Sequence, residues 1–314
     1  MIKGNVLIYT HTDMDGFGSN LIANYIENNY EDVKFTVKNL NYDQINEEIL
    51  KDIRDESIFT YDYIFITDIS VSEETSALLN ILWHSNDEYD IVNLELLDHH
   101  ESALWLNKYD WCNVILTKYN RKISGTELFA DSIFEDNIPE DIFNLIENIK
   151  LYDTWLWVEN NNQTPKKLND LFLLLGFEAF ERRLIEVNYD VNKFILKHRL
   201  LLQIQQKQID RYIKGKDKNL IVKEIQDRKV GIVFGDKYQS ELGNTLAKLH
   251  PELDIVAMIG DTYVSYRSVG DCEKNNCKSF SELYGGGGHF NSAGSTINKS
   301  VINNYLNELF NIKK

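Results

Sequence analysis

The chain has 314 residues, of which 43% are hydrophobic and 26% are charged, and its formal net charge is −16. This composition predicts a folded protein with one large domain or two ordinary ones. A groove that follows many phosphates needs clustered Lys and Arg, so the acidity argues against a high-affinity binder of long nucleic acid. A short oligonucleotide or a nucleotide held mainly by metals stays compatible with it.

The sequence also predicts a cytoplasmic protein that does not enter a membrane. No run of about 18 apolar residues is present, and the N-terminus leads directly into a strand pattern without the cleavage site of a signal peptide. The three cysteines, Cys112, Cys272 and Cys277, do not form a zinc-binding pattern, and we expect reduced thiols.

The first half of the chain alternates between strand and helix patterns. Near-continuous apolar strands are expected at 5–10, 33–37, 58–67 and 91–97. One helix is expected at 17–28, and another runs from its N-cap Ser72 through residue 82. This alternation predicts an α/β fold with a mostly parallel, doubly wound sheet.

Chemically reactive side chains follow three of these strands. His11, Asp13 and Asp15 come after the first, Asp68 after the third, and Asp98-His99-His100 after the fourth. Ligands of such sheets collect at the carboxyl ends of the strands, which favours one shared site.

A further carboxylate, Asp153, follows a helix that is expected to begin near Pro139. An Asp after a strand is often only a helix cap, and a His-His pair is usually on the surface. The combination of four acidic sites at element ends instead predicts a dinuclear metal centre. Carboxylates with two or three imidazoles suit Mn²⁺, with Mg²⁺ as the alternative.

The second half of the chain predicts a helical bridge and a smaller α/β domain. The pattern is helical from about 168 to 214, more plausibly as two helices than one over 181–214, and paired strands, a helix and a hairpin at Gly260-Asp261 follow. The expected domains are 1–180, a helical linker 181–215, and 216–314.

The second domain carries its own candidates for phosphate binding. Four consecutive glycines, of which Gly286, Gly287 and Gly288 are the last three, precede His289 and offer backbone N–H groups for an anion. Arg267 is expected within a strand, either as a surface residue or as a phosphate fork. Asn244, on a predicted helix, is a weaker candidate for a base or phosphate contact.

Together these residues resemble the DHH family of phosphoesterases with its DHH-associated C-terminal domain. The resemblance covers nearly the whole chain. Asp13-Met14-Asp15-Gly16 looks like motif I, Asp68 like motif II, Asp98-His99-His100 like motif III and Asp153 like motif IV. The glycine run with Ser292-Ala293-Gly294, and Arg267, look like the signature of the C-terminal domain.

The resemblance implies a role for each site residue. Asp13 and Asp68 would hold one Mn²⁺, and Asp15, Asp68, His99 and Asp153 the other. Asp98 would support the site and His100 would contact the phosphate. Arg267 and His289 would grip the substrate phosphate when the two domains close.

One departure from the family pattern concerns His11. Many members have a His four residues before the first Asp of motif I and a Pro directly before it, where this chain has Tyr9 and Thr12. This arrangement is closer to the branch of oligoribonucleases and cyclic-nucleotide phosphodiesterases, and His11 would be the replacement ligand.

The resulting hypothesis is a Mn²⁺-dependent phosphodiesterase that trims short oligonucleotides to mononucleotides. Alternatives are hydrolysis of a small nucleotide (3′-phosphoadenosine 5′-phosphate or a cyclic nucleotide), a single-strand DNA exonuclease, and a metal-free nucleic-acid-binding scaffold. The sequence does not fix the oligomeric state, and a homodimer is among the options.

Overall fold

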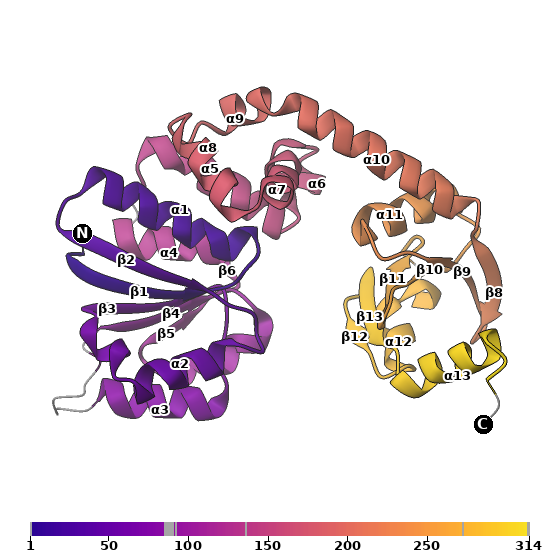
Figure 1. Ribbon diagram of the computed structural model, residues 1–314, viewed down its shortest axis with the longest axis horizontal. Coiled ribbons are helices and arrows are strands. Elements are labelled where there is room, and N and C mark those ends of the chain that lie inside the picture. Colours follow the sequence, from indigo (N-terminus) through magenta and orange to yellow (C-terminus); the bar gives the residue numbers. More distant parts are fainter. Residues whose placement is uncertain (1, 85–90, 92, 136, 272, 313–314) are drawn as a thin grey trace. The chain divides into compact units, whose positions relative to one another are not determined.

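The computed structural model describes residues 2–84, 91, 93–135, 137–271 and 273–312. The chain forms two compact units, Met1–Leu202 and Gln203–Lys314 (Figure 1). Cys112 and Cys277 are free thiols, whereas Cys272 lies outside the described residues. Among the described helices none is long and apolar enough to cross a membrane.

The first unit is built on a five-stranded sheet in the order β2-β1-β3-β4-β5, with every neighbouring pair parallel. The predicted α/β fold with a parallel sheet is therefore confirmed. The strands are β1 (Gly4–Thr10), β2 (Val33–Asn39), β3 (Tyr63–Thr67), β4 (Leu94–Asp98) and β5 (Cys112–Val114).

Two predicted strands begin later than expected. The segment Ser57–Thr60 forms a short 3₁₀ helix, η1, and only Tyr63–Thr67 is extended. The apolar residue Ile58 is buried by that helix against the sheet's core, so burial alone did not reveal its backbone conformation. β4 likewise begins at Leu94.

Successive side chains of the central strand point to opposite faces of the sheet, and each face has its own core. Val6 and Ile8 pack with one set of helices, while Leu7 and Tyr9 pack with the other. α1 (Met14–Asn29), α4 (Gly125–Phe134) and α5 (Glu140–Asp153) cover the first face. α2 (Ile45–Arg54), α3 (Glu73–Trp83) and the 3₁₀ helix η2 (Glu101–Lys108) cover the second (Figure 1).

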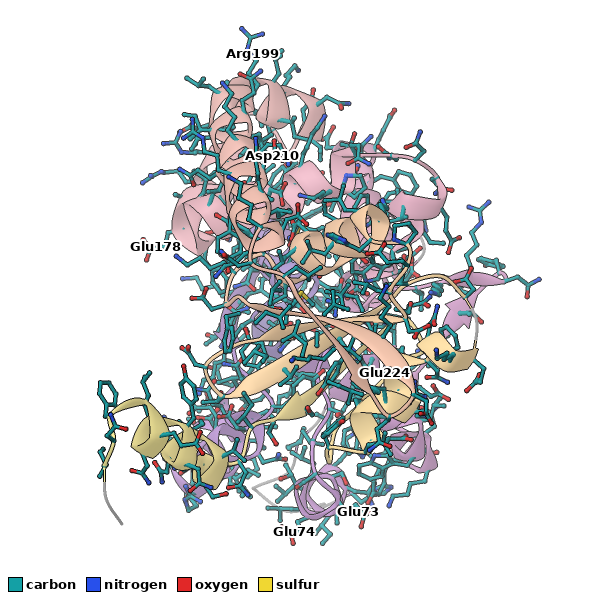
Figure 2. The ribbon with its side chains drawn as sticks, turned by 90° about the vertical axis from the view of Figure 1, so that its right-hand side faces the viewer. Glu73, Glu74, Glu178, Arg199, Asp210 and Glu224 are labelled. Carbon is teal, nitrogen blue, oxygen red and sulfur yellow. The ribbon has the colours of Figure 1, made fainter. Side chains whose placement is uncertain are left out.

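Side-chain caps fix where α1, α3 and α4 begin. Ser72 accepts a hydrogen bond from the N–H of Thr75, as its predicted capping role requires. Glu73 and Glu74 follow in the first turn of α3 and lie at the surface, where they complement the helix dipole (Figure 2).

A series of helices follows α5. The stretch 181–214, expected as two helices, belongs to three: the end of α8, then α9 and α10. Polar side chains such as Arg199 and Asp210 project from α10 into solvent (Figure 2). A two-stranded hairpin precedes α4. The elements are β6 (Thr117–Lys118), β7 (Arg121–Lys122), α6 (Leu156–Glu159), α7 (Thr164–Leu175), α8 (Phe177–Ile185), α9 (Val191–Lys197) and α10 (Arg199–Asp217).

The second unit has a six-stranded sheet in the order β12-β13-β11-β10-β9-β8, in which only β9 and β10 are parallel. The predicted hairpin at Gly260-Asp261 joins β10 to β11. The elements are β8 (Ile221–Ile225), β9 (Arg228–Phe234), α11 (Gln239–Leu249), β10 (Ile255–Ile259), β11 (Tyr263–Ser268), η3 (Glu273–Asn275), α12 (Cys277–Glu282), β12 (Gly287–Gly288), β13 (Ser292–Thr296) and α13 (Lys299–Leu309).

Candidate metal centre

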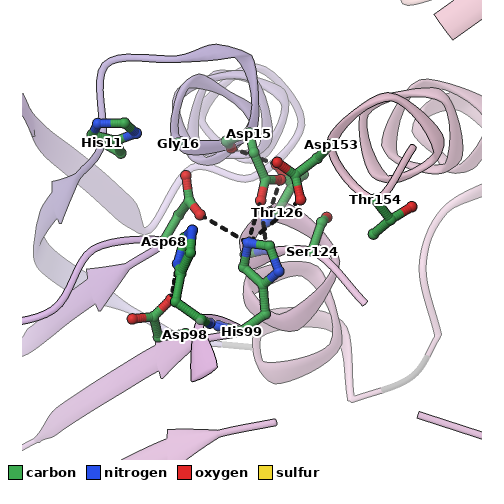
Figure 3. A network of polar contacts seen from close by, with 12 residues as sticks. His11, Asp15, Gly16, Asp68, Asp98, His99, Ser124, Thr126, Asp153 and Thr154 are labelled. Carbon is green, nitrogen blue, oxygen red and sulfur yellow. Dashed lines mark hydrogen bonds and ion pairs between the residues drawn. The ribbon is translucent and has the colours of Figure 1, made fainter. Parts of the chain in front are cut away.

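The predicted metal ligands of the first unit lie together at the carboxyl ends of β1, β3 and β4 (Figure 3). These three strands are neighbours, so the residues that follow them meet at one edge of the sheet. Asp153, the last residue of α5, reaches the same place from the helical layer.

His99 is at the centre of the cluster. Its Nε2 atom lies 3.2 Å from Asp68 Oδ1 and 3.5 Å from both Asp15 Oδ2 and Asp153 Oδ2. Carboxylates from three separate segments thus converge on one ring nitrogen, which is the geometry of a shared ligand set.

The carboxylate of Asp15 is held by the start of α4. Its Oδ2 accepts a hydrogen bond from the N–H of Gly125 (2.7 Å), and its Oδ1 accepts one from the N–H of Thr126 (3.0 Å). The hydroxyl of Thr126 donates to the backbone oxygen of Asp15. The sequence carries no local signal for this role, since two segments more than 100 residues apart make the contact.

Gly125 leaves room for Asp68. A Cβ atom at position 125 would lie 2.5 Å from Asp68 Cβ and 2.9 Å from Asp68 Cα. Gly16 is equally constrained, because a Cβ there would lie 2.4 Å from the carbonyl oxygen of His11. Both glycines let α1 and α4 approach the strand ends closely.

Asp68 is the most strained and least satisfied member of the cluster. It is 1% exposed, its backbone is left-handed (φ 58°), and its Oδ2 has no hydrogen-bond partner among the described residues. Burial, followed by the neighbouring charges of Asp15 and Asp13, raises the pKa of Asp68 well above its usual range.

Burial and neighbouring charges also shift the pKa values of other residues in the cluster. Burial, with Asp15 and Asp13, raises the pKa of Asp153 to about 8, and burial lowers the pKa of His99. A bound divalent cation relieves both the repulsion and the unpartnered oxygen of Asp68, so the residues fit a metal ion. Three sets of donor atoms lie within 4.8 Å of one another: His11, Asp13 and Asp68; Asp15, His99 and Asp153; and Asp68, Asp98, His99 and His100.

His11 and Asp13 form the outer part of the centre. His11 Nδ1 lies 3.0 Å from Asp13 Oδ2, and Asp13 also caps α1 through the N–H of Gly16. Burial alone would raise the pKa of Asp13, but the hydrogen bonds from His11 and Gly16 outweigh it and lower that pKa. The ring of Tyr42, which the sequence analysis did not single out, packs beside the ring of His11 with centroids 5.1 Å apart.

Asp98 orients the two histidines that follow it. Its Oδ1 accepts hydrogen bonds from the N–H of His99 (2.7 Å) and from Nδ1 of His100 (2.7 Å). The bond to the ring of His100 is the main cause that raises the pKa of His100. It leaves Nε2 of His100 available for another partner.

In the second unit, Arg267 is held against α11. Its Nη1 donates to the oxygen of Tyr266 (2.8 Å) and its Nη2 lies 3.3 Å from Ser240 Oγ. A Cβ on Gly243 would lie 2.5 Å from Arg267 Cγ, so the glycine leaves space for the arginine. Asn244 follows Gly243 and is exposed.

The glycine run pairs with the sheet beside Arg267. Arg267 is opposite Ser292 of β13, and the next residue, Ala293, is opposite Gly288 of β12. The N–H of Gly286 donates to Ser281, whereas His289 is exposed and donates its N–H to Ser292. A Cβ on Gly286 or Gly288 would meet β13 backbone within 3 Å, whereas Gly287 has open space.

Comparison with known proteins identifies relatives along almost the whole chain. No family model matches it. The chain is 30% identical to oligoribonuclease NrnB of Bacillus subtilis (strain 168) over 314 residues, which cover 97% of this chain and 76% of that protein.

Solved structures share the fold. RecJ of Thermus thermophilus in complex with Mn²⁺ superposes with a TM-score of 0.51 at 14% identity, over 95% of this chain and 50% of that one. The same RecJ with Mg²⁺ gives a TM-score of 0.50 at 11% identity, over 95% and 48%. With the motifs and the site geometry, the relationship to NrnB shows that this chain belongs to the DHH phosphoesterase family of phosphate-ester hydrolases.

Proposed function

We propose that the protein is a Mn²⁺-dependent phosphodiesterase that hydrolyses short oligonucleotides to mononucleotides. The observation that carries this proposal is the convergence of Asp15, Asp68 and Asp153 on His99, with one buried oxygen of Asp68 unpartnered among the described residues. Clustered carboxylates of this kind are costly unless a cation neutralises them.

Two metal ions divide the ligands in our proposal. His11, Asp13 and Asp68 would hold one ion, and Asp15, Asp68, His99 and Asp153 would hold the other, with Asp68 belonging to both sets. The first and second groups of donor atoms described above support this division. Imidazole ligands among carboxylates favour Mn²⁺ over Mg²⁺.

Bound divalent ions supply charge for the phosphate and lower the pKa of a water molecule. The chain's own residues then orient the reaction. Asp98 fixes the ring of His100 through Nδ1, and the raised pKa of His100 keeps it able to donate a proton from Nε2 to a phosphate oxygen.

In our proposal the second unit contributes to substrate binding. Arg267 and His289 contact the substrate phosphate, the side-chain-free run of Gly286, Gly287 and Gly288 lets that phosphate approach the backbone closely, and Asn244 lies beside them. The hydrogen bonds of Arg267 to neutral acceptors support this role, because its positive charge is left for an anion.

Two facts favour a short substrate. The net charge of −16 disfavours a long phosphate backbone, and the relative with 30% identity is named an oligoribonuclease. We place the enzyme in the cytoplasm, as the sequence predicts.

The test is hydrolysis of 5′-labelled RNA and DNA of two to about twenty-four nucleotides, with Mn²⁺, Mg²⁺ or EDTA. We expect Mn²⁺-dependent turnover concentrated at about two to five nucleotides. Strong cutting of long DNA would instead establish an exonuclease. Activity only on cyclic nucleotides or on 3′-phosphoadenosine 5′-phosphate would establish a small-nucleotide hydrolase, and inactivity on all of them a scaffold.

A further inference from the structure

Three aromatic residues lie close in sequence to Asp153, the proposed ligand at the end of α5. The segment Tyr152-Asp153-Thr154-Trp155-Leu156-Trp157 contains the proposed ligand Asp153, whose Oδ2 is 3.5 Å from His99. Trp155 is two residues further along, so its Cα lies at most about 7.6 Å from that of Asp153. None of the three rings has a role in the centre described above.

The rings form a continuous stack. Tyr152 and Trp157 have centroids 6.3 Å apart at an interplanar angle of 12°, and Trp157 and Trp155 have centroids 5.9 Å apart at 29°. Trp155 is the outer ring and is 49% exposed. The stack therefore ends in an indole that presents aromatic surface to solvent.

The backbone holds this outer ring in a costly conformation. Trp155 has φ 62°, in the left-handed region that a bulky side chain rarely adopts. The turn at Trp155 ends α5 and starts α6, and the backbone N–H of Trp155 donates to the backbone oxygen of Tyr152. Asp68 of the centre shares this left-handed backbone, and strain of this kind is often retained at ligand-binding sites.

A cation lies against the same turn. Lys122 of β7 is exposed, and its Nζ is 3.4 Å from the backbone oxygen of Thr154. The neighbouring Arg121 is also exposed. In a chain with a net charge of −16, an aromatic stack beside an exposed Lys offers one group that binds a base and one that binds a phosphate.

We propose that Trp155, supported by Trp157 and Tyr152, stacks on a nucleobase of the substrate next to the cleaved phosphate, and that Lys122 contacts a phosphate of the same strand. This inference rests on the proposed function and adds to it a subsite for single-stranded nucleic acid. Unpaired bases are recognised by stacking on aromatic rings, without strong base preference.

Two matched substrates test the proposal. One is the dinucleotide 5′-phosphoadenylyl-adenosine, and the other is the same dinucleotide with both bases removed. We would measure kcat and KM with Mn²⁺ for the wild type, Trp155→Ala, Trp155→Phe and Lys122→Gln. Val158→Ala is the control, since Val158 is a similarly exposed residue of α6 outside the stack. Thermal denaturation of each variant monitors folding.

Removal of the indole should affect only the substrate that has bases. Trp155→Ala should lower kcat/KM for the dinucleotide about tenfold or more, mainly through KM, and change the abasic substrate less than about twofold. Trp155→Phe should recover most of the loss, and Val158→Ala should match the wild type. Lys122→Gln should lower kcat/KM for both substrates by the same factor. An equal effect of Trp155→Ala on both substrates would overturn the subsite.

A second measurement separates this proposal from the proposed function. If the wild type hydrolyses neither substrate, the proposed function fails, and the subsite is judged by quenching of tryptophan fluorescence with the same dinucleotide. Quenching that is lost in Trp155→Ala but kept in Val158→Ala supports stacking. The same titration curve in all three proteins would refute it.

Discussion

Two buried carboxylates of the first unit differ in whether a positively charged side chain of the protein lies beside them. Asp52 and Asp68 are 2% and 1% exposed. Asp52, in α2, belongs to the face of the sheet covered by α2 and α3, and Asp68 lies at the carboxyl end of β3.

Asp52 is neutralised within the fold. Lys38 Nζ lies 2.7 and 2.6 Å from its two oxygens, and the hydroxyl of Tyr9 donates to Oδ2 at 2.5 Å. Burial alone would lower the pKa of Lys38, but the contacts with Asp52 and Glu48 outweigh it and raise that pKa. The buried negative charge of Asp52 therefore has a partner of opposite sign within the chain.

Asp68 has the opposite surroundings. Its neighbours are other carboxylates and His99, one of its oxygens is unpartnered among the described residues, and its pKa is raised. The comparison teaches that burial of an Asp does not by itself mark a functional site. The informative feature is burial whose charge the chain leaves unbalanced, because the missing cation must come from a ligand.

The largest expected effect comes from making the same substitution at both positions. Asp68→Asn should abolish bound metal and lower dinucleotide hydrolysis by more than about 100-fold, since loss even of a residue that only supports a ligand costs 10–100-fold. In EDTA the variant should be more stable than the wild type, because a repelled buried charge is gone. Metal analysis and thermal denaturation in EDTA measure both.

Asp52→Asn is the matched control. It should keep its metal and activity but lose about 1–3 kcal/mol of unfolding free energy, because Lys38 and Tyr9 lose a charged partner. Loss of metal in Asp52→Asn, or retained metal in Asp68→Asn, would remove the distinction between the two regions.

The space around Asp68 gives the next test. Gly125→Ala places a methyl group 2.5 Å from Asp68 Cβ, and it should displace the carboxylate and lower activity at least about tenfold, with about 1–3 kcal/mol lost in stability. Gly215→Ala in α10 meets nothing within 4 Å and should be neutral or gain up to about 1 kcal/mol. Unchanged activity of Gly125→Ala would show that the helix start does not position the centre.

Arg267, like Asp68, carries a charge that its hydrogen bonds do not balance, because its guanidinium donates to the neutral oxygens of Tyr266 and Ser240. Arg267→Ala should raise KM by a factor that corresponds to about 1–3 kcal/mol, with a smaller change in kcat. Steady-state kinetics on the dinucleotide measure the split. A fall in kcat at constant KM would assign Arg267 to the reaction step instead of substrate binding.

The smallest effect concerns another balanced pair, in the second unit. His250 Nε2 lies 2.6 Å from Asp217 Oδ1, and this bond raises the pKa of His250. Stability from the pair is complete below about pH 6.5, the unfolded value, and is lost as the pH rises through the higher folded value. His250→Gln should therefore destabilise more at pH 5.5 than at pH 8.5, by a small amount since the pair is partly exposed. A pH-independent difference would contradict this linkage.

The sequence alone determined the fold class, and it predicted the residues that the fold brings together at the strand ends. Parallel strands require their carboxyl ends to share an edge, so Asp68 and Asp98-His99-His100 could be grouped from strand order without coordinates. The helix cap at Ser72 followed from local chemistry in the same way. Both inferences depend on short-range patterns that a linear chain records directly.

Only the tertiary structure decided how the site is supported. Gly125 and Thr126 donate hydrogen bonds to Asp15, and Lys38 and Tyr9 donate hydrogen bonds to Asp52. Both sets of contacts join segments far apart in the chain, and neither has a local signal in the sequence. The left-handed backbone of Asp68 and Trp155 is likewise imposed by packing against intrinsic preference. Contacts between distant segments depend on the folded geometry, and periodicity in the sequence does not encode them.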